Sequence, residues 1–127
     1  SENSSLLQEI DGQSFVPLLK NEEIDYKPLF WHYPNWWGPS GPGIGSYSAV
    51  RQGEWKFIYF HNTQIMELYN LEKDIFENEN LIFVNSLKSE ELANVLSEYL
   101  KSVDAQMPYN KTTNSVVPWP NEHPVFN

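Results

Sequence analysis

Three short segments rich in aromatic and β-branched residues follow one another closely, and they constrain the fold of this chain most. They are "YSAVRQ" (47–52), "EWKFIYF" (54–60) and "QIMELYN" (64–70), and each has the composition of a β-strand. Gly53 marks a tight turn between the first two, and "HNT" (61–63) forms the next turn. Because strands joined by such short turns pair in opposite directions, the sequence predicts an antiparallel sheet.

The middle segment is largely apolar on both of its faces. In a strand, alternate side chains share a face, so one face carries Trp55, Phe57 and Tyr59 and the other carries Lys56, Ile58 and Phe60. A sheet with one face in water shows a cleaner alternation of apolar and polar residues. We therefore expect both sides of this strand to be covered.

One segment, 89–106, has the pattern of an amphipathic helix, with Ser89 as the expected N-cap. Its apolar stripe consists of Leu92, Val95, Leu96, Tyr99, Leu100 and Val103. Two shorter elements precede the sheet: a helical turn over 14–20 and a fourth strand over 29–33. The sequence thus predicts an α+β fold, a small antiparallel sheet of three to four strands with one long C-terminal helix packed on one face.

Length and charge narrow the class of protein. The 127 residues suit one domain, 1–127, and we expect loose ends at about 1–10 and 107–127. A net charge of −9 and a single arginine exclude the basic patch that nucleic acid or an anionic membrane surface requires. No apolar run reaches the length of a membrane span, so no membrane insertion is expected. Without cysteine the chain has no disulfide and no Cys-based zinc site.

Aromatic residues gather in "LFWHYPNWWGPSGPGIG" (29–45), which continues into a loop rich in Pro and Gly. A loop of this length inside a compact domain is usually functional or covered by another body. Trp36 and Trp37 either stack on a sugar ring or anchor the loop to a core. His32 at the start of the loop is either a half-buried, hydrogen-bonded side chain or a ligand contact.

The other polar candidates give weaker signals. His61 falls in a turn, where a solvated side chain is expected, although it also joins His32 and the two tryptophans as a candidate substrate-binding residue. Arg51, in a strand, is expected to pair with a carboxylate. Asp74, Glu77 and Glu79 lack the glycine and the final glutamate of a calcium loop and predict a solvated turn. No nucleophile with a base and no metal-ligand spacing can be assembled, so no catalytic and no metal residue is predicted.

Four phrases, in this order, resemble the C-terminal part of type I sulfatases, the formylglycine-dependent sulfate ester hydrolases of the alkaline-phosphatase-like superfamily. They are "DGQSFVPLL" (11–19), "PLFWHYP" (28–34), "SAVRQGEWKFIY" (48–59) and "ELYNLEKDIFENENL" (67–81). The resemblance covers residues 11 to about 105 and is most similar to bacterial sulfatases that act on glycans. It implies a C-terminal subdomain that leans on a large catalytic domain, with loops that wall the substrate cleft.

The resemblance also implies what should lie elsewhere. The family's nucleophile arises from Cys/Ser-x-Pro-x-Arg, whereas "SGPGI" (40–44) has Ile44 in place of the arginine, and the family's Asp-Asp calcium motif does not occur. Calcium and formylglycine are therefore expected in the full-length enzyme and neither in this fragment, which would be inactive alone. The expected partners are its own missing catalytic domain and a sulfated glycan, and the exposed sheet face predicts self-association of the fragment. The family implies a periplasmic or secreted enzyme.

Two other functions remain open from the residues alone. One is an autonomous carbohydrate-binding module that uses His32, Trp36 and Trp37. The other is a protein-interaction domain whose aromatic face docks a partner. Glycan binding by the isolated chain would favour the module, and a stable complex indifferent to glycans would favour the interaction domain.

Overall fold

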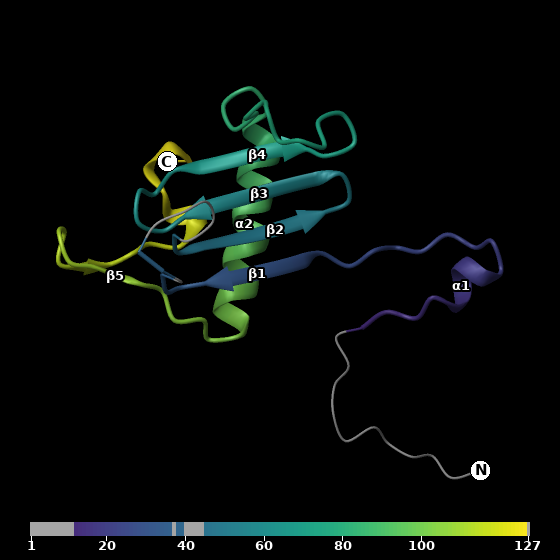
Figure 1. The fold of residues 1–127 in the computed structure, drawn as a ribbon, viewed down its shortest axis with the longest axis horizontal. Coiled ribbons are helices and arrows are strands. Elements are labelled where there is room, and N and C mark those ends of the chain that lie inside the picture. Colours follow the sequence, from purple (N-terminus) through teal and green to yellow (C-terminus); the bar gives the residue numbers. More distant parts are fainter. Residues whose placement is uncertain (1–11, 37, 40–44, 127) are drawn as a thin grey trace, which may run out of the picture.

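The computed structural model describes residues 12–36, 38–39 and 45–126. Its centre is a four-stranded antiparallel sheet in the order β1-β2-β3-β4, formed by β1 (Leu29–Tyr33), β2 (Tyr47–Gln52), β3 (Trp55–Phe60) and β4 (Met66–Asn70). The long helix α2 (Ser86–Ser102) crosses one face of this sheet (Figure 1). The predicted α+β fold, with three to four strands and one long C-terminal helix, is confirmed.

The turn between β2 and β3 follows from the backbone freedom of glycine. Gly53 has φ of 59°, a left-handed conformation that costs glycine little, and the register pairs Gln52 with Trp55 across a two-residue loop. This register fixes the two faces of the sheet. Phe57 and Tyr59 point toward α2, and Ile58 points to the opposite face, which we call the open face.

The core lies between the sheet and α2. Leu92, Leu96 and Leu100 of the helix are fully buried against the strands. Phe30 of β1 stacks on Tyr99 of α2 with ring centroids 3.8 Å apart. The prediction that Val103 belongs to the same buried stripe is wrong. Val103 is the C-cap residue at which the helix ends, and it is 52% exposed.

The start of α2 also differs from the prediction. Ser89 is not the N-cap, because the helix begins three residues earlier and Ser89 lies buried inside it. Its hydroxyl donates to the carbonyl oxygens of Ile82 (2.9 Å) and Asn85 (3.0 Å). Inside a helix, a serine hydroxyl can donate to a carbonyl oxygen of the preceding turn. The sequence alone does not distinguish such a serine from one that caps the helix.

The open face carries a smaller apolar cluster of its own. Ala49, Ile58 and Tyr69 are buried there, and the half-buried side chains packed around them are Trp31, Tyr47, Phe60 and Leu71. The prediction that both sides of β3 are covered is thus confirmed for the face under α2, whereas the described side chains of this second cluster come from the sheet itself and from Leu71 directly after it.

The C-terminal segment contributes to the main core, whereas the sequence predicts a loose end from 107 onward. Met107 and Val117 are buried in the core, and the segment forms a small hairpin of β5 (Tyr109–Asn110) and β6 (Ser115–Val116). Two short 3-10 helices follow, η1 (Pro120–Glu122) and η2 (Pro124–Phe126). The Asn121 backbone N–H donates to Ser97 Oγ at 3.0 Å, which fastens η1 to α2.

The N-terminal part behaves differently. Figure 1 shows residues 12–28 as an arm that extends away from the sheet and carries the short helix α1 (Val16–Leu19). No residue of α1 is buried, and Phe15 and Leu19 are 72% and 83% exposed. The predicted loose end over 1–10 lies outside the described residues. Within the part of the chain that is described, no helix is both long and apolar enough to cross a membrane.

Candidate functional site

The candidate site is the base of the 34–46 loop, where β1 ends and β2 begins. Tyr33 and Tyr47 are paired in register and their rings lie 5.2 Å apart. The His61 backbone N–H donates to the Ser46 carbonyl at 3.0 Å, and Ser46 is buried. Both ends of the loop are therefore held firmly by the sheet.

The structure brings His32 and His61 together on the helix side of the sheet. His32 Nδ1 lies 2.8 Å from Ser48 Oγ, and Ser48 Oγ lies 2.7 Å from His61 Nε2. His32 Nε2 lies 3.0 Å from the carbonyl oxygen of Gln106, just beyond α2. We call these three side chains, His32, Ser48 and His61, the histidine relay.

The burial of the relay differs from the expectation for His61. The prediction of a solvated His61 is wrong: both Ser48 and His61 have no exposed surface. Burial, and next the neighbouring His32, lowers the pKa of His61 to about 4, so its ring is neutral at pH 7. His32 is half-buried, with both ring nitrogens in hydrogen bonds.

A serine between two histidines resembles the geometry of an activated nucleophile. Ser48, however, has no exposed surface, so a substrate atom cannot reach its hydroxyl. The relay can therefore orient side chains, but it cannot attack a substrate. Sequence reasoning missed Ser48, because only the strand register and the contact across 13 residues bring it to His61.

The structure describes one of the two tryptophans of the loop. Trp36 is 58% exposed, which leaves most of its ring available for contact. Trp37 lies outside the described residues. An exposed indole offers a flat apolar face with a polar N–H, the combination suited to a sugar ring.

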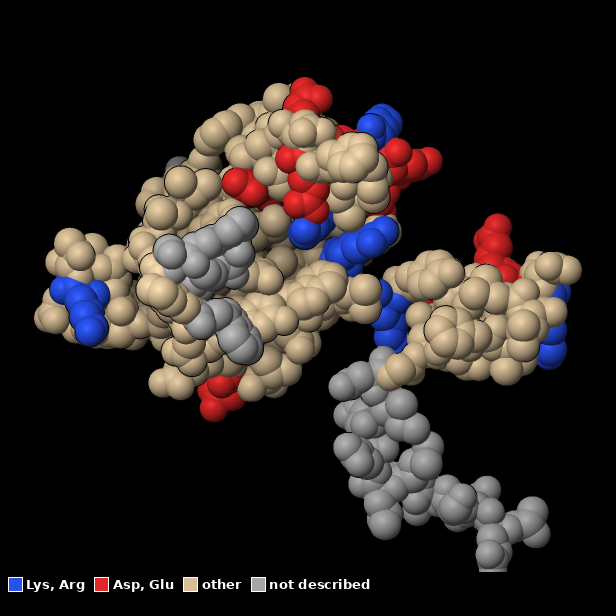
Figure 2. Space-filling model, viewed as in Figure 1, with Lys and Arg blue, Asp and Glu red and all other residues tan. Residues whose placement is uncertain are grey.

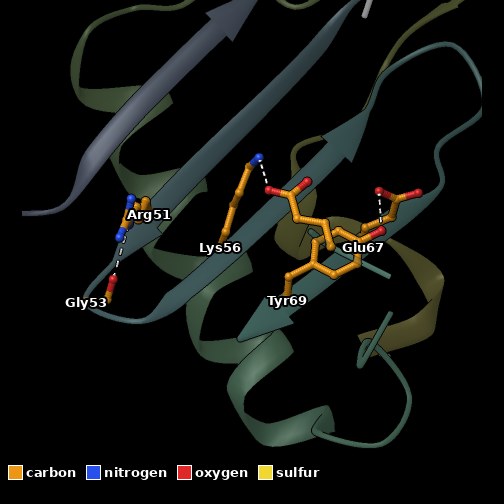
Figure 3. A network of polar contacts seen from close by, with 6 residues as sticks. Arg51, Gly53, Lys56, Glu67 and Tyr69 are labelled. Atoms are coloured by element: carbon orange, nitrogen blue, oxygen red, sulfur yellow. Dashed lines mark hydrogen bonds and ion pairs between the residues drawn. The ribbon is translucent and has the colours of Figure 1, made fainter. Parts of the chain in front are cut away.

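A polar network lies on the open face (Figure 3). Lys56 forms an ion pair with Glu77, and the Tyr69 hydroxyl donates to Glu67 Oε2 at 2.9 Å. Burial and the hydrogen bond to Glu67 raise the pKa of Tyr69, which keeps its hydroxyl protonated.

The prediction that Arg51 pairs with a carboxylate is not met among the described residues. Arg51 is exposed, and its Nε donates to the Gly53 carbonyl at 3.3 Å (Figure 3). Among the described residues it forms no ion pair. The nearby turn carries Glu77, which pairs with Lys56 instead.

The acidic turn after β4 is built from internal hydrogen bonds. Asp74 Oδ2 accepts from the Glu79 backbone N–H at 2.9 Å, and Asp74 Oδ1 accepts from Asn78 Nδ2 at 3.3 Å. Backbone hydrogen bonds from Glu79 and Asn78 lower the pKa of Asp74. Figure 2 shows acidic side chains gathered around this end of the molecule. Within the described residues, no group of three or more His, Asp or Glu side chains could hold a metal ion.

Fold and site together define a small α+β domain with a rigid loop base and exposed aromatic side chains. The chain belongs to the family described as N-sulphoglucosamine sulphohydrolase, C-terminal, whose model matches residues 4–106. The resemblance to the C-terminal subdomain of a sulfatase is thereby confirmed.

Individual relatives agree with this family. The chain is 31% identical to a sulfatase of Formosa agariphila over 87 residues, 65% of this chain and 16% of that protein. Its fold matches BT4656, solved in complex with its substrate D-glucosamine-2-N,6-O-disulfate, with a TM-score of 0.60 and 24% identity over 79% of this chain and 21% of that one. It also matches BT1596, a 2-O GAG sulfatase, with a TM-score of 0.55 and 23% identity over 79% and 22% of the two chains. The chain thus spans about a sixth to a fifth of the length of these relatives.

Proposed function

We propose that this chain is the C-terminal part of a sulfatase that hydrolyses sulfate esters of glycans. The observation that carries the proposal is the family match over residues 4–106. The fold likeness to sulfatases that act on sulfated sugars supports the substrate class. The full-length enzyme would work in the periplasm or outside the cell.

The reaction centre of such an enzyme does not fit the residues present. Formylglycine would supply the nucleophile and calcium would bind the sulfate group. The chain has no cysteine, and Ile44 replaces the arginine of the only similar serine phrase. The described side chains form no cluster suited to a metal ion. In this proposal both groups belong to the catalytic domain, and the fragment alone is inactive.

The chain's own role is to complete the fold and to wall the substrate cleft. The arm over residues 12–28 exposes the neighbouring apolar side chains Phe15, Val16, Leu18 and Leu19, and a contiguous group of exposed apolar side chains marks a contact with another body. The catalytic domain is the partner that fits, since most of each sulfatase relative lies outside the matched part.

Direct contact with the glycan is assigned to the loop. Trp36 presents an exposed ring, and Trp37 follows it in sequence. In this proposal His32 and His61, the other two candidates, act indirectly, through the ends of the loop, because His61 is buried and both ring nitrogens of His32 are engaged.

A desulfation assay on the full-length protein tests the proposal. We expect release of sulfate from a sulfated glucosamine, and we expect Trp36→Ala to raise KM while kcat changes little, because a stacking contact is shared by ground and transition states. Tyr109→Ala is the control, an aromatic residue 54% exposed on the β5–β6 hairpin. No sulfate release from any sulfated glycan would contradict the proposal. Tight glycan binding by the chain alone would favour the autonomous module.

A further inference from the structure

The hydrogen bonds of the histidine relay all run in one direction, which is set by the backbone carbonyl of Gln106 at one end. A backbone carbonyl oxygen only accepts hydrogen bonds, so the proton between His32 and Gln106 resides on His32 Nε2. In a neutral imidazole the other nitrogen is then an acceptor. His32 Nδ1 therefore accepts from the Ser48 hydroxyl at 2.8 Å.

The same reasoning continues to the buried end. Ser48 uses its single hydroxyl proton on His32, so its oxygen accepts from His61 at 2.7 Å. The proton of neutral His61 thus resides on Nε2, and His61 Nδ1 is left as a bare acceptor. That nitrogen is buried and has no hydrogen-bond partner among the described residues. A nitrogen without a proton has no donor group that must find an acceptor, so this environment agrees with the assignment.

We propose that Ser48 and His61 are positioning residues that hold the His32 ring in one orientation and thereby join the base of the 34–46 loop to Gln106 beyond α2. Three parts of the sheet meet in this contact: β1 through His32, β2 through Ser48 and the turn directly after β3 through His61. The His61 backbone also holds Ser46, so the same residue fixes the second end of the loop. The consequence for substrate rests on the proposed function: the relay fixes the position of Trp36, which contacts the glycan.

Nitrogen NMR of the histidine side chains in this chain tests the direction of the relay. Above about pH 8, where imidazole rings are neutral, we expect both His32 and His61 to carry their proton on Nε2 and to have an unprotonated Nδ1. A proton on Nδ1 of either ring would overturn the proposal, because Ser48 would then have to donate in the opposite direction.

Variants test whether the relay acts as a unit. Ser48→Ala should leave His61 as a mixture of tautomers, since its acceptor is gone. Ser97→Ala is the matched control: Ser97 is equally buried, but its hydroxyl bonds Ala93 and Asn121 instead. His61→Gln keeps an N–H donor toward Ser48 and should leave the His32 signals unchanged. Unchanged His61 signals in Ser48→Ala, or altered ones in Ser97→Ala, would overturn the relay.

Kinetics of the full-length enzyme test the consequence for substrate. Ser48→Ala should raise KM several-fold with kcat little changed, and Ser97→Ala should change neither. An unchanged KM in Ser48→Ala would overturn the role of the relay in placing the loop. Absence of sulfatase activity in the unaltered enzyme would instead overturn the proposed function and leave the NMR result standing.

Discussion

At the scale of single residues, His61 should make the stability of this domain depend on pH. Its folded-state pKa of about 4 is below the value of 6.5 for an unfolded chain. The unfolded state therefore binds the proton first, and the free energy of unfolding falls as pH drops from about 6.5 to about 4. The full loss is about 3 kcal/mol, from the size of the pKa difference. Urea denaturation at several pH values across this range measures it.

The matched variant is His61→Gln, which cannot titrate. It should lose much of the pH dependence of unfolding in this window, although burial also lowers the pKa of His123, so a smaller dependence should persist. Equal pH profiles for the two proteins would show that His61 is not the group responsible.

The sequence could predict some of these residues but not their surroundings. A half-buried, hydrogen-bonded His32 was one of two readings that the sequence left open, and the structure has this geometry. The burial of His61 could not be predicted from its turn. The His61 ring contacts Ser48, 13 residues away, and the ring of His32, which itself contacts Gln106 across 74 residues. Such distant contacts leave no local pattern in a single sequence.

At the scale of elements, the outer edge of β4 is closed by the segment that follows it. Asn80 Oδ1 accepts from the backbone N–H groups of Leu68 and Ile82, each at 3.0 Å, and its Nδ2 donates to the Met66 carbonyl at 3.3 Å. The Leu81 N–H donates to the Leu68 carbonyl at 2.8 Å. An edge strand covered in this way cannot easily pair with another chain.

We expect Asn80→Ala to lower the free energy of unfolding by about 2 to 4 kcal/mol, because two backbone N–H groups lose their acceptor. Chemical denaturation measures this loss. Asn78→Ala is the control, since the Asn78 side chain makes one exposed hydrogen bond to Asp74 and the substitution keeps the backbone, and it should change stability by less than about 0.5 kcal/mol. Equal effects of the two substitutions would be evidence against the closing role of Asn80.

The helix α2 offers a second comparison within one element. Leu96 has no exposed surface and Leu87 is 83% exposed. Leu96→Ala should cost about 2 to 5 kcal/mol, because it leaves a cavity in the core. Leu87→Ala should stay within about 0.5 kcal/mol. Thermal and urea unfolding of both variants check this, and a large loss from Leu87→Ala would indicate that the helix packs differently.

Periodicity predicted the elements well wherever one local pattern decided them. The strands at 29–33 and 47–52 have the bounds that their sequence indicates. The helix stripe was right for its leucines and wrong for Val103, where the chain leaves the helix. The packing of Met107 and Val117 had no such pattern, because isolated apolar residues among prolines do not show which core they join.

At the scale of the whole molecule, apolar surface is distributed unevenly. The face under α2 is closed, whereas the arm over 12–28 contributes nothing to the core. The open face presents the half-buried rings of its own strands. A domain that leaves its arm in water in this way suits a larger protein, which agrees with a chain that spans about a fifth of its structural relatives.

We therefore expect the isolated chain to self-associate through the open face. Its net charge of −9 opposes association, so added salt should strengthen it by screening the repulsion between copies. Sedimentation velocity over a range of protein and salt concentrations measures the average mass. An average mass that stays that of a monomer under all conditions would contradict this expectation.

Two variants locate the contact. Trp31→Glu places a charge among the aromatic side chains of the open face and should abolish association, since a buried unpaired carboxylate is costly. Phe83→Glu adds the same charge at a residue 79% exposed in the segment after β4 and outside the apolar cluster of the open face, and should leave association intact apart from a weak charge effect. Dissociation by Phe83→Glu but not by Trp31→Glu would move the contact from the open face to the turns beside β4.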